Sequence, residues 1–299
     1  MTDELIGVNV GGTTTTIVRG NASGSIFAHT SFATESARGA EDLYARIASG
    51  VAELQTASTR AAGVAIGGPC DVRRGVVINT PHLPFRDFPL AQRLGDERGL
   101  PVRIEHDAAA CALAEWRWGV DAGVAGLAYL TCGTGFGVGL VLDGKPRYGS
   151  TGHSPEIGHV RYRDDGPDIF GKPGCFEGFG SGTALALLAR QRDPSGLGLL
   201  EPSRIAELAR EGNDLAAEIL RKNETAVGAA CALLADLLVL DVIVLGSLAR
   251  YLGAPWIAAV QRTFEREALA ANAQHCRLRA PMEDVQDLSG LAAAISAAP

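Results

Sequence analysis

Two glycine-rich segments carry the first chemical signals in this sequence. Residues 11–14 read Gly-Gly-Thr-Thr, and residues 133–139 read Gly-Thr-Gly-Phe-Gly-Val-Gly. Glycines let backbone N–H groups approach an anion closely, and threonine hydroxyls add further donors. One such loop often does no more than turn the chain, but two loops with threonine favour phosphate binding. The sequence contains no Walker motif, GxxxxGK[ST]. The second segment does not fit the Rossmann spacing either, because its glycines alternate in period two, which suits a hairpin.

Carboxylates stand next to imidazoles at two further places. Asp107 follows Glu105 and His106 at the end of an apolar run, directly before a helical pattern. Such a residue serves either as a helix N-cap or as a general base at the carboxyl edge of a strand. Glu156 and His159 lie three residues apart in a loop that lacks the HExxH zinc signature. Taken alone, this pattern favours polar residues of an exposed loop over a binding site.

Residues 174–183 read as a loop that enters a helix. Ser181 and Thr183 are both candidate caps for that helix. Cys175, taken alone, is typical of a small buried apolar side chain.

Composition restricts the class of protein. The 299 residues carry 27 Lys and Arg against 34 Asp and Glu, a net charge of −7, which argues against a nucleic-acid partner. Six scattered cysteines without a CxxC pair indicate neither a disulfide framework nor a zinc ribbon. The acidic start shows no secretory signal, and the most apolar stretch, residues 226–246, is broken by Asp236 and Asp241. We therefore expect a cytoplasmic protein with no membrane partner.

The apolar pattern predicts the elements that position these residues. The first block contains three strands, a helix and a fourth strand, expected at residues 5–10, 17–20, 25–32, 41–55 and 62–66. A similar order returns after residue 125, where a strand, a glycine turn at 133–139 and a strand at 140–142 lead into a hairpin turn at Asp143-Gly144. Later helices are expected at 183–190, 203–210, 213–234, 255–270 and 288–297, with a strand at 241–245. Two similar blocks, each with a glycine turn, indicate a duplication.

The ordered set of segments resembles the ROK family of bacterial sugar kinases, within the actin, sugar-kinase and Hsp70 superfamily. Residues 9–14 resemble its first phosphate loop, Asp-x-Gly-Gly-Thr-Lys, and residues 131–139 its second. Residues 156–159 are similar to its sugar-gripping loop and residues 171–177 to the tail of its zinc motif. The other matches, in family order, are residues 67–69, 79–84, 105–107 and 242–246.

This resemblance implies an α/β protein with the two-lobed actin-like (ribonuclease H-like) ATPase fold, each lobe a mixed sheet flanked by helices. We expect a small N-terminal lobe of residues 1–107 plus 286–299 and a large C-terminal lobe of residues 108–285. The implied activity is transfer of the γ-phosphate of ATP to a hexose hydroxyl, usually the 6-OH, with Asp107 as the base. Closure of the lobes over the sugar would exclude water.

The resemblance also assigns roles to other residues. Five residues would contact the sugar: His106, Glu156, His159, Glu177 and Gly68. Nine would bind ATP, mostly through its phosphates: Gly11, Gly12, Thr13, Thr14, Gly133, Thr134, Gly135, Gly137 and Gly246. Mg²⁺ would neutralise the developing charge.

Three departures from the family pattern matter. Asn9 replaces the aspartate that orients Mg²⁺ through water, which puts metal affinity or turnover in doubt. Asp168 and Phe170 replace two zinc-binding cysteines, so His159 and Cys175 are remnants and no zinc is expected. His106 and His82 replace asparagines on the sugar side, so glucose is not assured as the substrate, and an allose-like sugar, an N-acetylated sugar or a cyclitol is an alternative.

The family resemblance leaves two alternatives to a kinase, namely a sugar-binding or regulatory paralogue and a transcriptional repressor. A sugar-binding or regulatory paralogue with little phosphotransfer is favoured by Asn9. The family's repressors place a helix-turn-helix before the first phosphate loop, which here begins at Asn9, and the negative charge also argues against them. We expect a small-molecule sugar as the partner and, by family analogy, a homodimer.

Overall fold

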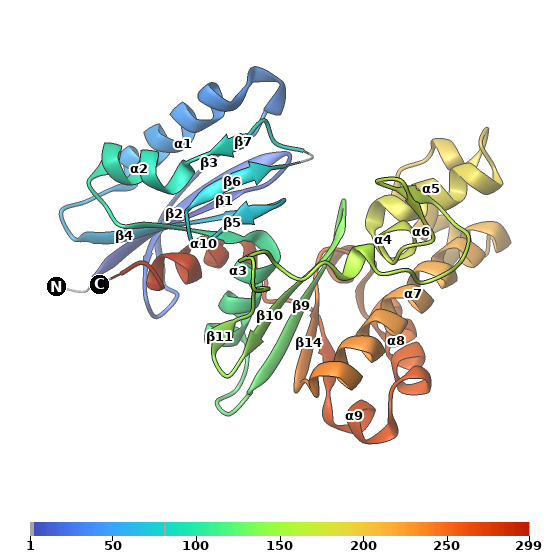
Figure 1. Cartoon of the computed structure of the whole chain (residues 1–299). Helices are drawn as coiled ribbons and strands as arrows, with labels where there is room; N and C mark the ends of the chain where they lie inside the picture. The colour runs from blue at the N-terminus through green and yellow to red at the C-terminus, as the bar shows by residue number, and fades with distance from the viewer. Residues whose placement is uncertain (1–2, 81, 299) are drawn as a thin grey trace. The chain divides into compact units, whose positions relative to one another are not determined.

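The computed structural model describes residues 3–80 and 82–298, which form two compact units (Figure 1). Unit 1 comprises Met1–Ala122, Gly144–Ser154 and Met282–Pro299, and unit 2 comprises Gly123–Asp143 and Pro155–Pro281. Pro81, within the expected segment 79–84, and the ends of the expected N-terminal lobe at residues 1, 2 and 299 lie outside the described residues. The division into lobes at residue 107 stays a prediction.

Unit 1 is built on a mixed sheet of five strands, β1 (Glu4–Val10), β2 (Thr14–Asn21), β3 (Ile26–Ala33), β4 (Thr59–Ile66) and β8 (Val102–His106). Their order is β3-β2-β1-β4-β8, in which the first three strands pair antiparallel and β1, β4 and β8 run parallel. The carboxyl ends of β1, β4 and β8 therefore lie at one edge of the sheet. A smaller antiparallel sheet is formed by β5 (Cys70–Asp71), β6 (Val76–Asn79) and β7 (Arg86–Phe88).

Helices cover both faces of the unit 1 sheet (Figure 1). On one face, α1 (Ala40–Leu54) and α2 (Leu90–Arg98) bury Leu43, Ile47 and Leu94 against the strands. The other face receives α10 (Val285–Ile295), which also contacts α3 (Asp107–Ala114). The remaining turns are η1 (Ser36–Arg38) and η2 (Glu115–Gly119).

Unit 2 repeats the strand directions of unit 1. Its strands β9 (Gly126–Cys132), β10 (Phe136–Leu142), β14 (Val242–Leu245) and β15 (Arg277–Arg279) lie in the order β10-β9-β14-β15. The β9–β10 pair is antiparallel, whereas β9, β14 and β15 are parallel. Short β11 (Lys145–Pro146) follows β10 in the chain.

Helices make up most of the rest of unit 2. The long α7 (Asp214–Leu238) packs along α8 (Leu248–Glu267), which kinks at Gly253 before Pro255. The others are α4 (Glu177–Gly180), α5 (Gly182–Arg192), α6 (Pro202–Arg210), α9 (Ala270–His275), η3 (Ile157–His159) and η4 (Leu197–Leu199), with a hairpin of β12 (Asp168–Ile169) and β13 (Lys172–Pro173). Within residues 3–80 and 82–298, the helices include none with the length and apolar character that a membrane crossing requires.

Two local expectations need correction. The glycine turn expected at residues 133–139 is shorter, because β10 begins at Phe136 and includes Gly137 and Gly139. Period-two glycines are compatible with a strand whose other residues are apolar, and here the strand pattern prevails. Asp107 is the first residue of α3, with His106 at the N-cap position, so the expected cap is displaced by one residue.

Candidate functional site

Asp107 lies where β8 ends and α3 begins. Its Oδ1 accepts a hydrogen bond of 2.6 Å from the Ala108 N–H and lies 3.3 Å from Nδ1 of His106. The first turn of a helix favours a negative charge, because its N–H groups have no partners within the helix. The Asp107 side chain is 44% exposed, whereas that of His106 is 12% exposed. The carboxylate is therefore held at one oxygen and open to an approaching group.

Gly67 and Gly68, directly after β4, shape the surface beside this carboxylate. A Cβ at Gly67 would lie 3.3 Å from Oδ2 of Asp107. Gly68 has a φ of +91°, and a Cβ there would lie 2.6 Å from Cγ2 of Thr80. Backbone conformation and lack of space both require glycine at position 68. The second carboxylate oxygen of Asp107 thus faces backbone on this side.

Glu105 is a buried carboxylate on β8 for which the sequence predicts no role. Its Oε1 lies 2.5 Å from Nε of Arg103, and Oε2 has no hydrogen-bond partner among the described residues. Burial raises the pKa of Glu105, while Arg103 acts in the opposite direction. Burial also raises the pKa of the Cys70 thiol to about 12, with further upward contributions from Glu105 and Asp107. Carboxylates therefore make the electrostatic environment near Cys70 negative.

The first phosphate loop, residues 11–14, is the turn between β1 and β2. Within it, the Gly11 N–H donates to the Thr14 carbonyl at 3.1 Å. Thr34 holds the loop by its carbonyls, since its N–H donates to Thr13 O at 2.8 Å and its hydroxyl donates to Gly11 O at 2.7 Å. Gly12 and Thr13 are exposed. Their N–H groups can therefore bind an anion while Thr34 holds the neighbouring carbonyls.

Asn9 precedes this loop on β1. It is half-buried and pairs in register with Thr16 on β2 and Ala65 on β4. An amide oxygen is an acceptable but uncharged magnesium ligand, and Mg²⁺ usually keeps several waters and binds through nucleotide phosphates. The described residues include no group of three or more His, Cys, Asp or Glu side chains that could hold a metal. The role of Asn9 in orienting magnesium stays a prediction.

The second phosphate loop, residues 133–135, joins β9 to β10 beside the starts of two helices. The carbonyl of Gly133 accepts a 2.7 Å hydrogen bond from the N–H of Gly182, the first residue of α5. A Cβ at Gly133 would lie 3.1 Å from Oγ of Ser247, the residue before α8. The Gly246 N–H donates to Leu130 O at 2.8 Å, which fixes the end of β14 here. Helix N-termini favour anions, so this place suits phosphate.

Glu177 connects the second phosphate loop to residues 156–159, called here the sugar loop. Its Oε2 accepts a 2.9 Å hydrogen bond from the Phe136 N–H. A Cβ at Gly158 would lie 2.2 Å from the Phe136 carbonyl oxygen and 3.4 Å from Oε2 of Glu177. Both loops therefore meet at Phe136. Gly137, predicted to bind phosphate, lies inside β10 with its N–H donating to Oγ1 of Thr131 at 2.8 Å.

The other two sugar-loop candidates are exposed. Glu156 directly precedes η3, and its carbonyl accepts the His159 N–H at 3.2 Å. The His159 ring stacks on Phe170, with centroids 5.7 Å apart and planes at 17°. Nζ of Lys172 donates to the His159 carbonyl. The sugar-gripping roles of Glu156 and His159 stay predictions.

The residues around Cys175 do not fit a zinc ion. Phe170 cannot ligate metal and instead stacks on His159. Oδ1 of Asp168 accepts the Gly171 N–H at 2.8 Å within the β12–β13 turn. Cys175 is fully buried, as its pattern indicated. A structural zinc site needs four ligands, so this loop is held by a hairpin and a ring stack instead.

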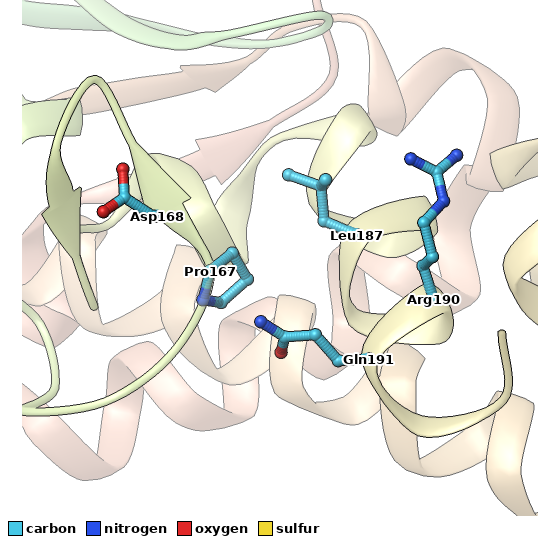
Figure 2. Close-up of a pocket in the computed structure, with 5 residues that line it drawn as sticks. All are labelled: Pro167, Asp168, Leu187, Arg190 and Gln191. Carbon is cyan, nitrogen blue, oxygen red and sulfur yellow. The ribbon is translucent and has the colours of Figure 1, made fainter.

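A pocket of about 190 Å³ lies beside this hairpin in unit 2 (Figure 2). Asp168 and Pro167 line one side, and three residues of α5 line the other: Leu187, Arg190 and Gln191. None of the predicted binding residues lines it, so the pocket is separate from the candidate site in unit 2.

The predicted site residues thus form two groups, one in each unit. Unit 1 holds Asn9, the first phosphate loop, Gly68, His106 and Asp107, and unit 2 holds the second phosphate loop, the sugar loop, Glu177 and Gly246. Sequence reasoning missed Thr34, Glu105, Phe136 and Ser247. Only Glu105 and Phe136 lie within matched motifs, and no local pattern distinguishes Thr34, which follows β3 20 residues after Thr14.

Comparison with curated proteins shows similarity to both kinases and repressors. The glucokinase of Streptomyces coelicolor is 32% identical over 195 residues, covering 59% of this chain and 61% of that protein. The xylose repressor of Caldicellulosiruptor bescii is 26% identical over 221 residues, covering 70% of this chain and 55% of that protein. The chain therefore spans about three fifths of the length of these relatives.

Structure and family comparisons cover almost the whole chain. A glucokinase from Streptomyces griseus, solved in complex with glucose and AMPPNP, matches with a TM-score of 0.82 and 28% identity over 98% of this chain and 99% of that one. This likeness confirms the predicted actin-like α/β fold class. The family model described as "ROK family" matches residues 5–297. The chain belongs to the ROK family.

Proposed function

We propose that this protein is an ATP-dependent carbohydrate kinase that transfers the γ-phosphate of ATP to a hydroxyl, the 6-OH, of a hexose or related sugar. The position of Asp107 is the observation that carries the proposal. One of its oxygens is fixed by the Ala108 N–H, and the other faces the backbone of Gly67. A carboxylate held in this way can receive a proton without first reorganising.

Asp107 acts as the general base. It accepts the proton of the sugar hydroxyl as the oxygen of that hydroxyl attacks the γ-phosphorus and the bond to ADP breaks. Most of the remaining catalysis in phosphoryl transfer comes from positioning and electrostatic stabilisation. We assign sugar binding to His106 and Gly68 of unit 1 and to Glu156, His159 and Glu177 of unit 2.

The two phosphate loops bind ATP. Exposed N–H groups of Gly12 and Thr13 serve in unit 1, and the loop at Gly133–Gly135 serves in unit 2 beside two helix N-termini. Magnesium bound with ATP supplies positive charge that offsets the charge on the phosphates. Asn9 would help to orient that ion through water, and because its side chain is neutral, the ion would be held chiefly by the nucleotide.

A second function is favoured by the same residue. Without a carboxylate at position 9, a sugar-binding or regulatory protein with little phosphotransfer is the alternative. Such a protein would still bind the sugar but would transfer little or no phosphate to it.

A coupled ADP-release assay with MgATP and a panel of sugars separates the two functions. The kinase predicts that at least one sugar stimulates ADP release, and that Asp107→Ala abolishes the stimulation while calorimetry still detects sugar binding. Sugar binding by the wild type without turnover of any sugar would support the regulatory alternative.

A further inference from the structure

We propose that Glu177 is a positioning residue that couples sugar binding to the second phosphate loop, which deepens the proposed function and rests on it. One carboxylate would serve two partners. Oε2 accepts the Phe136 N–H at the start of β10, and Oε1 would accept a hydroxyl of the sugar. Hydrogen bonds to an ionised acceptor are stronger than neutral ones, so this contact can transmit a change from one partner to the other.

The backbone of Glu177 is held firmly in the core of unit 2. Its carbonyl accepts the Ser181 hydroxyl at 2.8 Å, which closes the short α4. Fully buried Asn223 on α7 donates to the carbonyls of Phe179 and Ser181 at 2.9 and 3.2 Å. The same amide accepts the indole N–H of Trp256 at 3.0 Å. The carboxylate of Glu177 therefore projects from an anchored helix.

The peptide that Glu177 holds is confined on its other sides. Gly158 of the sugar loop lies against the Phe136 carbonyl, since a Cβ at Gly158 would come within 2.2 Å of that oxygen. A Cβ at Gly180 would lie 2.9 Å from Cε2 of the Phe136 ring. A Cβ at Gly135 would lie 3.1 Å from Oε2 of Glu177. A shift of either loop must therefore move Phe136 or the Glu177 carboxylate.

This arrangement predicts reciprocal coupling between the two ligands. If sugar binding fixes the carboxylate and the carboxylate fixes residues 133–136, sugar will tighten nucleotide binding, and nucleotide will tighten sugar binding by the same factor. A residue that only contacted sugar would change sugar affinity alone.

Calorimetry of MgADP binding, with and without saturating glucose or fructose, measures the coupling. In the wild type we expect the sugar to increase the affinity for MgADP by about 5-fold or more. Glu177→Ala should bring that ratio close to 1. Glu177→Gln, whose amide oxygen can still accept the Phe136 N–H, should keep part of it. The matched control is Glu156→Ala. It should weaken sugar binding yet leave the ratio of MgADP affinities with and without sugar as in the wild type. Loss of sugar affinity in Glu177→Ala with an unchanged ratio would overturn the proposal.

A double-mutant comparison tests the contact without any sugar. Gly135→Ala should weaken MgADP binding several-fold, because the added Cβ displaces Oε2 of Glu177. This loss of affinity should largely vanish in a Glu177→Ala background. Gly133→Ala is the matched control, because its Cβ would lie the same 3.1 Å from a different neighbour, Oγ of Ser247. Its penalty should be the same in both backgrounds. Equal, additive penalties for the two glycines would contradict the contact.

These two experiments separate the possible failures. If neither glucose nor fructose nor any other sugar of the panel binds the wild type, the proposed function fails. The Gly135 and Glu177 comparison still reports on the link between Glu177 and the nucleotide loop. Circular dichroism and the thermal midpoint of each variant identify losses that come from unfolding.

Discussion

The two phosphate loops join strands with the same pairing, yet they are held by different chemistry. In unit 1, neutral Thr34 binds two carbonyls of the loop at 2.7 and 2.8 Å. In unit 2, the carboxylate of Glu177 binds the Phe136 N–H directly after the loop at 2.9 Å. Holding carbonyls leaves the amide groups for an anion, whereas a carboxylate competes with the anion for amides and adds negative charge. The amides of the first loop are therefore left for an anion, whereas the amide directly after the second loop already has a carboxylate as its partner.

The sheets of the two units also differ in how helices reach them. In unit 1, α10 approaches the strand backbone at glycines, since a Cβ at Gly7 would lie 2.5 Å from the Leu291 nitrogen. In unit 2, β9 and β14 meet their helices through apolar side chains such as Leu130, Ile243 and Leu245. The α10 face of the unit 1 sheet thus depends on glycines, whereas β9 and β14 of unit 2 meet their helices through apolar side chains.

The largest stability effect should come from filling the close approach in unit 1. A Cβ at Gly63 would lie 2.2 Å from the Ala294 nitrogen and 2.3 Å from the Gly290 carbonyl oxygen. Because the three nearest atoms all belong to the backbone, which cannot move aside like a side chain, Gly63→Ala should lower the free energy of unfolding in urea by about 3 kcal/mol. The control, Gly149→Ala, has its nearest neighbour at 3.7 Å and should change little. Equal stability of the two variants would show that α10 can move away freely.

Removing the polar anchor of unit 2 should have the next largest effect. Asn223→Ala deletes the three buried hydrogen bonds of that amide and should cost about 2–3 kcal/mol in thermal or urea unfolding. Asn213→Ala on the same helix removes one cap bond to the Ala216 N–H and should cost about 1 kcal/mol. If Asn223→Ala is no more costly than Asn213→Ala, the network does not hold α4 in place.

The first loop can be tested through its hydroxyl. Thr34→Val keeps the shape but removes the donor to Gly11 O and the partner of the buried Thr15 hydroxyl at 3.0 Å. We expect about 1–2 kcal/mol lower stability and MgADP binding weakened about 5- to 10-fold by calorimetry. Thr34→Ser, which retains the hydroxyl, should stay near the wild type. Unchanged nucleotide affinity in Thr34→Val would mean that the loop needs no such support.

A pH-dependent effect on stability is expected at a carboxylate on α7. Burial raises the pKa of Glu224 to about 7, although Arg262 and Arg221 act in the opposite direction. Its unfolded pKa is about 4.3, so its contribution to stability is present below that pH and is lost as pH rises towards 7. Glu224→Gln should therefore flatten the fall in thermal midpoint between pH 5 and 7. Glu218→Gln, at a half-buried carboxylate on the same helix whose pKa is lowered by hydrogen bonds from Lys222 and Arg192, provides the control. Parallel curves of thermal midpoint against pH for the wild type and Glu224→Gln would contradict the prediction.

Much of the fold could be predicted because it depends on local patterns. The apolar spacing of Leu43, Ile47 and Val51 predicts α1, and Ser181 caps α5 as one of the two expected candidates, accepting the Ala184 N–H. The turn at Asp143-Gly144 also forms, with both residues at positive φ. Such features are determined by a few neighbouring residues, so sequence is enough to find them.

The contacts that shape the candidate site were not predictable in the same way. Thr34, directly after β3, holds the first loop, although β3 is separated from β1 by β2 in the sheet. Ser247, which follows β14, lies beside the second loop. The register of Asn9, Ala65 and Glu105 across three parallel strands likewise depends on the assembled sheet. These contacts join residues that are far apart in the sequence, so the identity of one residue does not predict its partner.

Single-turnover phosphoryl transfer in wild type and Asp107→Asn tests the central claim most directly. The experiment mixes excess enzyme with radiolabelled MgATP and the sugar that the panel identifies as best, and calorimetry on the same samples measures sugar affinity. Asp107→Asn keeps the shape of the side chain but cannot accept the proton. The account predicts that the transfer rate falls by about 10²- to 10⁴-fold while the sugar dissociation constant changes by only a few-fold. A variant that transfers phosphate at the rate of the wild type would contradict it.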